Sequence, residues 1–304
     1  MNSKQEVVVA RGLTKSFGNV KAVDGIDFEV REGECFGILG PNGAGKTSTM
    51  RMLYDFSPRD GGELKVFGMD PARLGNQVRQ LLGVVQQQDN LDQELTVREN
   101  LEVYAGYYGI DFHGLGGRLD ELLEFMELEG RGGSQIRELS GGMQRRLTIL
   151  RALVHNPRMV ILDEPSTGLD PQARHQIWAV LRKLMSGGVT VVLTTHYMDE
   201  AERLCDRLVI MDKGHILHEG APRELIARHL KRLVLEADLR DLQESWTTCG
   251  LEYESYGDRV FFNAESEDAF SVVPYRENVV MGVLRPAGLE DVFLKLTGRR
   301  LEDG

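Results

Sequence analysis

The segment GPNGAGKT, residues 40–47, constrains the fold of this chain more than any other stretch. It follows the apolar run ECFGILG, which reads as a buried strand, and precedes the helical run TSTMRMLYDF. The segment fits the pattern G-x-x-x-x-G-K-[ST], in which glycines let backbone N–H groups close around phosphates between a strand and a helix. The sequence therefore predicts an α/β fold with a phosphate-binding loop at the end of a buried strand.

Short apolar runs alternate with helical patterns across residues 1–220, which favours a largely parallel sheet. Strand-sized runs are MVILDEP, VTVVLTTH, and the pair RLVIMD and HILHEG with a turn between them. A helix-rich insert occupies about 91–155, where Thr96 and Glu99 form the pattern of a capping box. From residue 221 to 304 the sequence changes to short strand candidates with helices between them, so we expect a small C-terminal α+β domain.

Bulk composition excludes several classes of protein. A net charge of −11 argues against a surface that mainly binds nucleic acid. The three cysteines are far apart and form no CxxC pair, so we expect neither a zinc ribbon nor a disulfide framework. No run approaches the ~18 apolar residues of a membrane-spanning helix, and MNSKQEVVVA lacks the apolar core of a secretory signal. We therefore expect any membrane role to be peripheral.

Five side chains carry the expected chemistry. Lys46 would reach the β- and γ-phosphates of a nucleotide, and Thr47 would offer a hydroxyl to Mg²⁺. Asp163 and Glu164 end an apolar strand, at the edge where α/β sheets bind ligands. We expect Asp163 to hold Mg²⁺, directly or through water, and Glu164 to polarise the attacking water as general base. His196 also ends a strand, where it would contact the γ-phosphate, although a lone histidine there is more often structural.

A second helix start, LSGGMQRRL at residues 139–147, has a serine cap and free N–H groups and is itself suited to an anion. With it, the chain resembles the ATP-binding cassette (ABC) ATPases over residues 6–220. In order, GPNGAGKT resembles the Walker A loop, VVQQQDN the Q-loop, LSGGMQ the signature, VILDEP Walker B, STGLD the D-loop and LTTHYMDEAERLCDRLVIM the switch-histidine segment. The tail GLEDVFLKLTGRR is similar to the C-terminus of the branch that serves drug, antibiotic and Nod-factor exporters.

The resemblance implies an ATP site shared by two chains that stack head to tail. One chain would contribute Phe17, Gly40, Pro41, Asn42, Gly43, Ala44, Gly45, Lys46, Thr47, Ser48, Gln87 and Asp163, and its partner would contribute Ser140, Gly141 and Gly142. Lys46, Glu164 and His196 would be catalytic, and Thr47, Gln87 and Asp163 would bind Mg²⁺.

Three of these assignments keep a second interpretation. Phe17 matches the aromatic residue that stacks on adenine, but a core phenylalanine on an early strand fits as well. The Q-loop contact is assigned to Gln87, with a register slip to Gln86 or Gln88 left open. Asp170 matches the D-loop aspartate at the dimer seam, and it also reads as the N-cap of the helix that starts at Pro171.

The resemblance also implies the architecture and the role of the chain. Residues 1–220 would form a P-loop NTPase core with a helical subdomain at 91–155 and an antiparallel β edge, followed by the small domain at 221–304. The chain would hydrolyse ATP at the cytoplasmic face of the cell membrane and power export through a separate transmembrane subunit. The cargo would be a drug, antibiotic, lipid-like or oligosaccharide-type substrate, and no nucleic acid is expected.

Two further points stay open at this level. A soluble ABC-type ATPase that acts on ribosomes or nucleic acid is the alternative, although such relatives usually carry two cassettes, long coiled coils or zinc modules. In the helical insert, where family members dock their membrane partner, Tyr104, Tyr107 and Tyr108 are either contact residues or core residues, and the core interpretation is slightly favoured.

Overall fold

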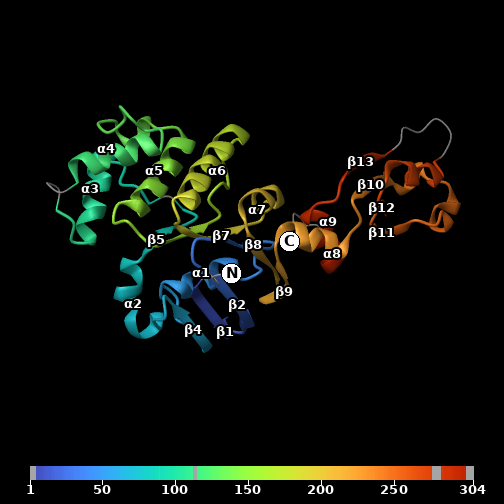
Figure 1. Ribbon diagram of the computed structural model, residues 1–304, viewed down its shortest axis with the longest axis horizontal. Helices are drawn as coiled ribbons and strands as arrows, with labels where there is room; N and C mark the ends of the chain where they lie inside the picture. Colours follow the sequence, from blue (N-terminus) through green and yellow to red (C-terminus); the bar gives the residue numbers. More distant parts are fainter. Residues whose placement is uncertain (1–4, 89, 112–114, 276–281, 299–304) are drawn as a thin grey trace. The chain divides into compact units, whose positions relative to one another are not determined.

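The structure is a computed structural model of the 304-residue chain and describes residues 5–88, 90–111, 115–275 and 282–298. It divides into two compact units, Met1–Ile216 and Leu217–Gly304 (Figure 1). The composition of the sequence changes near this border, at about residue 220.

The first unit alternates strands and helices. Its elements are β1 (Glu6–Phe17), β2 (Val20–Arg31), β3 (Cys35–Leu39), α1 (Lys46–Leu53), β4 (Gly61–Val66), α2 (Pro71–Gln80), β5 (Leu82–Val85), α3 (Val97–Tyr107), α4 (Gly116–Phe125), the 3-10 turn η2 (Ile136–Glu138), α5 (Gly141–Leu153), β6 (Met159–Asp163), α6 (Pro171–Ser186), β7 (Thr190–Thr195), α7 (Met198–Leu204), β8 (Arg207–Asp212) and β9 (His215–Gly220), the last of which crosses the border.

A six-stranded sheet of order β5-β6-β7-β3-β8-β9 organises this unit. The pairs β5–β6, β6–β7, β7–β3 and β3–β8 are parallel, and every residue of β3, β6 and β7 is buried. Parallel strands that are covered on both faces have continuous apolar sequences. These three strands can therefore be predicted from the sequence. The predicted α/β class is therefore confirmed.

The last two strands of the sheet, β8 and β9, are joined by Lys213 and Gly214, whose φ angles are 47° and 82°. Positive φ at both central residues is the signature of the two-residue turn that best matches the twist of paired strands. This turn lies where the sequence predicts one.

A second sheet, of order β2-β1-β4, is antiparallel and faces the same core. Val23 of β2, Phe36 of β3 and Met50 of α1 are all at most 1% exposed and belong to one hydrophobic cluster. The strands β1 and β2 each have 12 residues, but register shifts interrupt their pairing and blur the apolar alternation in the sequence.

The helical insert comprises α3, α4 and α5, drawn in green in Figure 1, apart from the blue strands β1 and β2. The predicted capping box at its start is present, because Thr96 Oγ1 accepts from the N–H of Glu99 and Glu99 Oε2 accepts from the N–H of Thr96. Helix α5 is buried from Arg145 to Leu153 and so forms the core of the insert.

The second unit contains α8 (Pro222–His229), β10 (Leu233–Asp238), η3 (Leu239–Asp241), η4 (Glu244–Thr248), β11 (Glu252–Tyr256), β12 (Arg259–Ala264), η5 (Glu267–Val272), β13 (Val283–Pro286) and α9 (Leu289–Thr297). Its antiparallel sheet has the order β11-β12-β10-β13. Phe262 and Phe261 are neighbours on β12 and belong to different apolar clusters, as expected when alternate side chains leave opposite faces of a strand. The first part of the strand candidate ENVVMGVLR lies outside the described residues.

None of the described helices combines the length and apolar character needed to cross a membrane.

Candidate active site

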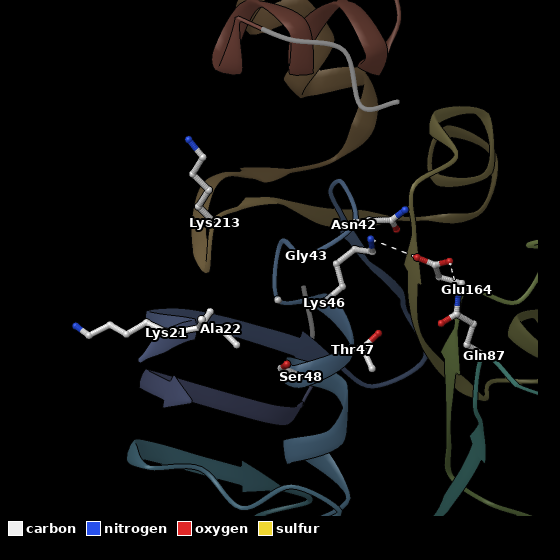
Figure 2. Close-up of a pocket in the computed structure, with 12 residues that line it drawn as sticks. Lys21, Ala22, Asn42, Gly43, Lys46, Thr47, Ser48, Gln87, Glu164 and Lys213 are labelled. Atoms are coloured by element: carbon white, nitrogen blue, oxygen red, sulfur yellow. Dashed lines mark hydrogen bonds and ion pairs between the residues drawn. The ribbon is translucent and has the colours of Figure 1, made fainter. Parts of the chain in front are cut away.

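A cleft of about 600 Å³ lies over the glycine-rich loop in the first unit (Figure 2). Side chains and backbone from β2, the loop, α1, the segment after β5, the end of β6 and the β8–β9 turn line it. The lining residues are Val20, Lys21, Ala22, Asn42, Gly43, Gly45, Lys46, Thr47, Ser48, Gln87, Glu164 and Lys213.

The loop has the backbone that a phosphate site requires. Gly45 has φ 104°, a conformation that other residues rarely adopt, and a Cβ there would lie 2.2 Å from the carbonyl oxygen of Ala22. Helix α1 begins directly after Gly45, so the N–H groups of Lys46, Thr47 and Ser48 have no acceptor within the helix. These N–H groups and the positive end of the helix dipole favour an anion in the cleft.

Lys46 is buried, at 4% exposed, and its ammonium group is held from both sides. Nζ donates to the carbonyl oxygens of Gly40 and Pro41 at 2.8 and 3.0 Å and lies 3.3 Å from Oε1 of Glu164. Burial lowers the pKa of Lys46, and the neighbouring Glu164 carboxylate opposes this shift. The loop therefore holds a cation in position before any phosphate arrives.

Four groups surround the carboxylate of Glu164 (Figure 2 shows Lys46 and Gln87 among them). Oε1 lies 3.3 Å from Lys46 Nζ and 3.3 Å from His196 Nδ1. Oε2 accepts from Gln87 Nε2 at 3.2 Å and from Thr167 Oγ1 at 3.1 Å. Side chains far apart in the sequence thus meet at one carboxylate.

This environment sets the charge of Glu164. Burial acts to raise the pKa of the carboxyl, but contact with His196 and the charge of Lys46 outweigh it and lower the pKa to about 2. Glu164 is therefore ionised at neutral pH, as a general base must be.

The backbone at Glu164 is strained. Its φ is 48°, in the left-handed region that a non-glycine residue seldom occupies. The N–H of Glu164 donates to both the carbonyl oxygen and Oγ1 of Thr194, at 3.2 and 3.0 Å, which helps to hold this conformation. With this conformation the side chain of Glu164, the residue directly after β6, lines the cleft.

Asp163 and Thr47 form an oxygen-rich pair beside this carboxylate. Oδ1 of Asp163 accepts from Thr47 Oγ1 at 3.1 Å and from Thr194 Oγ1 at 2.6 Å. A carboxylate next to a hydroxyl at the head of a phosphate-binding loop is the donor set that Mg²⁺ prefers. The residues present thus fit a magnesium ion.

The other predicted contacts lie outside this cleft. Ser140 caps α5 by accepting from the N–H of Met143 at 3.3 Å, and Ser140 and Gly141 are exposed. Gly142 packs beside Ala173, near enough that a Cβ would lie 2.9 Å from that of Ala173. Asp170 is exposed and caps α6, since Oδ1 accepts from the N–H of Ala173 at 2.9 Å.

The structure also bears on the alternatives left open by the sequence. Phe17 is 52% exposed at the end of β1, so it is not a core residue, and it does not line the cleft. Among the three glutamines, the side chain of Gln87 lines the cleft. Tyr107 is 80% exposed on α3, so the core interpretation is wrong for this residue.

Three residues that contact the site are not indicated by any motif role in the sequence: Thr167, Thr194 and Arg145. The two threonines hold Glu164 and Asp163, and nothing in their local pattern indicates that. The guanidinium of Arg145 is buried behind the cleft, at 4% exposed. A signal for this burial does exist, because Arg145 shares the helical stripe of the apolar residues Ile149 and Ala152.

Comparison with known proteins identifies two family patterns in the chain. The family described as "ABC transporter" matches residues 23–167, and the one described as "Nodulation factor export protein NodI, C-terminal domain" matches residues 236–298. The chain is 44% identical to the Nod factor export ATP-binding protein I of Cupriavidus metallidurans, with 98% of this chain and 99% of the relative covered. It is 45% identical to the protein of that name from Mesorhizobium japonicum, with 96% and 87% covered.

Solved structures of ATP-binding cassettes are also similar to this chain. A dimeric ATP-binding cassette in a post-hydrolysis state, bound to ADP and phosphate, is 30% identical with a TM-score of 0.62 over 70% of this chain and 98% of that one. The cbiO1 protein of Clostridium perfringens, part of the ABC transporter complex cbiONQ, is 26% identical with a TM-score of 0.68 over 74% and 92%.

Proposed function

This chain belongs to the ABC transporter family of ATPases, and on that premise we propose that it powers export through a separate transmembrane protein at the cytoplasmic face of the membrane. The observation that carries the proposal is the meeting of Lys46, Gln87, Thr167 and His196 at the Glu164 carboxylate. The cleft thus combines a phosphate-binding loop with an ionised base, which is what hydrolysis of a γ-phosphate requires.

In the proposed reaction, ATP binds with its phosphates against the N–H groups that start α1. Lys46 then turns from Glu164 to the β- and γ-phosphates, and the carboxylate of Glu164 is released to accept a proton from the attacking water. His196, at the other side of Oε1, is placed to donate to the γ-phosphate. Removal of water from the cleft strengthens each of these interactions.

We assign magnesium binding to Thr47, Asp163 and Gln87. The first two form an oxygen pair in the structure, and Gln87 brings an amide to the same carboxylate as Lys46. When bound, the ion would neutralise charge on the transferring phosphoryl group.

Each cleft would be completed by a second copy of the chain. The signature residues Ser140, Gly141 and Gly142 start a helix with free N–H groups, yet they do not line the cleft of their own chain. A head-to-tail dimer would bring the signature of one copy to the γ-phosphate of the other. Phe17 would stack on the adenine from its exposed position at the end of β1.

For the membrane partner we propose a docking surface on the helical insert. Tyr107 and Val103 lie one turn apart on α3 and are 80% and 45% exposed. Beside them lies a hollow of about 200 Å³, whose lining includes Leu95, Tyr104 and Arg151. Exposed aromatic residues beside a hollow are typical anchors of protein interfaces.

We propose that the cargo is a Nod factor or a molecule that resembles one. The support comes from relatives that carry the name Nod factor export ATP-binding protein I and from the C-terminal unit, which matches the C-terminal domain of that export protein. In such an assembly the cargo path would lie in the membrane protein, so the cassette supplies energy and not selectivity.

Capture of the transporter from native membranes tests this function. Tagged Glu164→Gln protein should bind ATP, turn it over slowly and remain in the ATP-bound dimer. With Mg-ATP it should therefore retain a polytopic membrane protein in near-stoichiometric amount from gently solubilised membranes. Lys46→Ala is the control, because it should not bind ATP and should retain less of the partner. Recovery of ribosomes or nucleic acid, or of the cassette alone from the soluble fraction, would favour the soluble alternative instead.

A further inference from the structure

Helix α5, which begins at the signature residues, places a buried arginine directly behind the catalytic cleft. Arg145 is 4% exposed and does not line the cleft. It therefore has no direct route to a nucleotide, and any effect it has on the reaction must pass through other residues.

The guanidinium of Arg145 joins three neighbouring carbonyl groups at the end of β6. Nε donates to the carbonyl oxygen of Pro165 at 2.8 Å, and one terminal nitrogen donates to those of Asp163 and Glu164 at 3.2 Å each. These are the residues around the strained turn of Glu164, whose φ is 48°. The N–H of Glu164 is held by Thr194, so its peptide groups are fixed on both sides.

The same guanidinium also reaches the segment that follows β5. Its other terminal nitrogen donates to the carbonyl oxygen of Gln86 at 2.8 Å. The next residue, Gln87, places its amide 3.2 Å from Oε2 of Glu164. One side chain thus holds the backbone carbonyl of Glu164 and that of Gln86, the residue directly before Gln87.

We propose that Arg145 is a positioning residue for hydrolysis, which holds Glu164 and Gln87 at the site of water attack. The inference rests on the proposed role of Glu164 as general base. Arginine suits this task because its planar fork donates in several fixed directions, whereas a lysine ammonium on a flexible stem does not reproduce that geometry. Loss of the fork would leave the nucleotide-binding loop in place and misdirect the base.

The variant Arg145→Lys tests the proposal, with Arg146→Lys as matched control. Arg146 is the next residue of α5, is 7% exposed, and donates to the carbonyl oxygens of Met126 and Glu127, neither of which lines the cleft. The two variants therefore disturb equally buried arginines of one helix, and only the first touches the catalytic turn.

Equilibrium titration with ATP and steady-state hydrolysis are measured on each full-length variant. For Arg145→Lys we expect kcat to fall about tenfold or more while the Kd for ATP stays within about twofold of wild type. For Arg146→Lys we expect both to stay within about twofold. Arg145→Gln, which keeps donors but loses the charge and the fork, should lower kcat further at a similar Kd.

Several outcomes would overturn the proposal. An unchanged kcat in Arg145→Lys would show that Glu164 needs no such support, and an equal loss of kcat in Arg146→Lys would assign the effect to the stability of α5. A matching loss of ATP binding in Arg145→Lys would indicate general damage to the fold. If the wild-type chain itself fails to hydrolyse ATP, the proposed function fails and not this inference alone.

Discussion

At the scale of single residues, the site is organised around one carboxylate. Glu164 is buried at the end of strand β6. Thr194 helps to hold its strained backbone. Its neighbours Lys46 and His196 keep the carboxyl ionised. A buried charge is tolerated only when it is paired and hydrogen-bonded. Removal of either Lys46 or Glu164 alone therefore takes the oppositely charged neighbour from the other, which keeps only its remaining hydrogen bonds and contacts.

The lowered pKa of Glu164 predicts a pH-dependent part of the stability. The carboxyl has a pKa of about 2 in the folded chain against an ordinary value of 4.5. Its contribution is therefore fully present above about pH 4.5 and is lost as the pH falls towards 2. The shift corresponds to roughly 3 kcal/mol in the free energy of unfolding, of which roughly 2 kcal/mol is lost by about pH 3.

Denaturant unfolding of wild type and Glu164→Gln at neutral pH and near pH 3 measures this difference. Glutamine cannot ionise, so the gap between the two proteins should change by roughly 2 kcal/mol in favour of the variant on acidification. A gap that stays constant over this range would mean that Glu164 is not held by its neighbours in the way the structure shows.

The residues of the site differ in how far the sequence could predict them. The loop pattern predicts Lys46 and Thr47, and the apolar run that precedes Asp163 and Glu164 predicts those two. These four could be predicted because their roles depend on residues that are adjacent in the sequence. The contacts of Thr167 with Glu164 and of Arg145 with the carbonyl groups depend on tertiary packing. A helical stripe indicates that Arg145 is buried, but it does not say what the guanidinium meets.

At the scale of elements, three helices begin at or directly after residues assigned to the nucleotide site. Helix α1 begins at Lys46 with a glycine cap, α5 begins after Ser140, and α6 begins after Asp170. The buried parallel strands could be predicted because their apolar runs are continuous. The strands β1 and β2 could not be delimited, since register shifts break their alternation.

Substitutions of Asp170 can separate its two assigned roles, the N-cap of α6 and a contact at the dimer seam. In the structure its side chain caps α6, and a dimer would also place it at the seam. Asparagine caps helices as well as aspartate does, so Asp170→Asn should keep the stability of wild type, whereas Asp170→Ala should lose about 1 kcal/mol.

Thermal unfolding and ATP hydrolysis of both Asp170 variants are the measurements. If Asp170→Asn retains full stability and loses activity, the charge acts at the seam. If it retains both, and only Asp170→Ala is affected in stability, capping is the whole role of this residue.

At the scale of the whole molecule, the chain carries two helix starts suited to an anion, and the one at Ser140 does not line the cleft of Lys46. In the proposed dimer, the loop of Ser140 from one copy would complete the cleft of Lys46 in the other. The fold class was predictable from the order of the motifs. The second unit was not predictable beyond its α+β character, because short strands without chemistry-bearing motifs say little about their pairing.

Mixing two inactive variants tests the shared site. Ser140→Arg has an intact loop at Lys46 but a blocked signature, and Lys46→Ala has the reverse. A mixed dimer would contain one intact site, so the mixture should hydrolyse ATP faster than either variant alone, at up to half the wild-type rate per mixed dimer. The measurement is ATPase activity against mixing ratio under dimerising conditions, and a mixture no faster than its parents would contradict the shared site.

The ion pair between Lys46 and Glu164 has a consequence for nucleotide exchange. The carboxylate is an intramolecular competitor for the ammonium group, present at an effective concentration set by the fold. An incoming triphosphate must displace it, and only a ligand that also contacts the rest of the cleft can do so readily. After cleavage the same competitor returns, so a free phosphate that has lost its link to the nucleotide is at a disadvantage. The Glu164 carboxylate therefore favours the release of product phosphate over its rebinding.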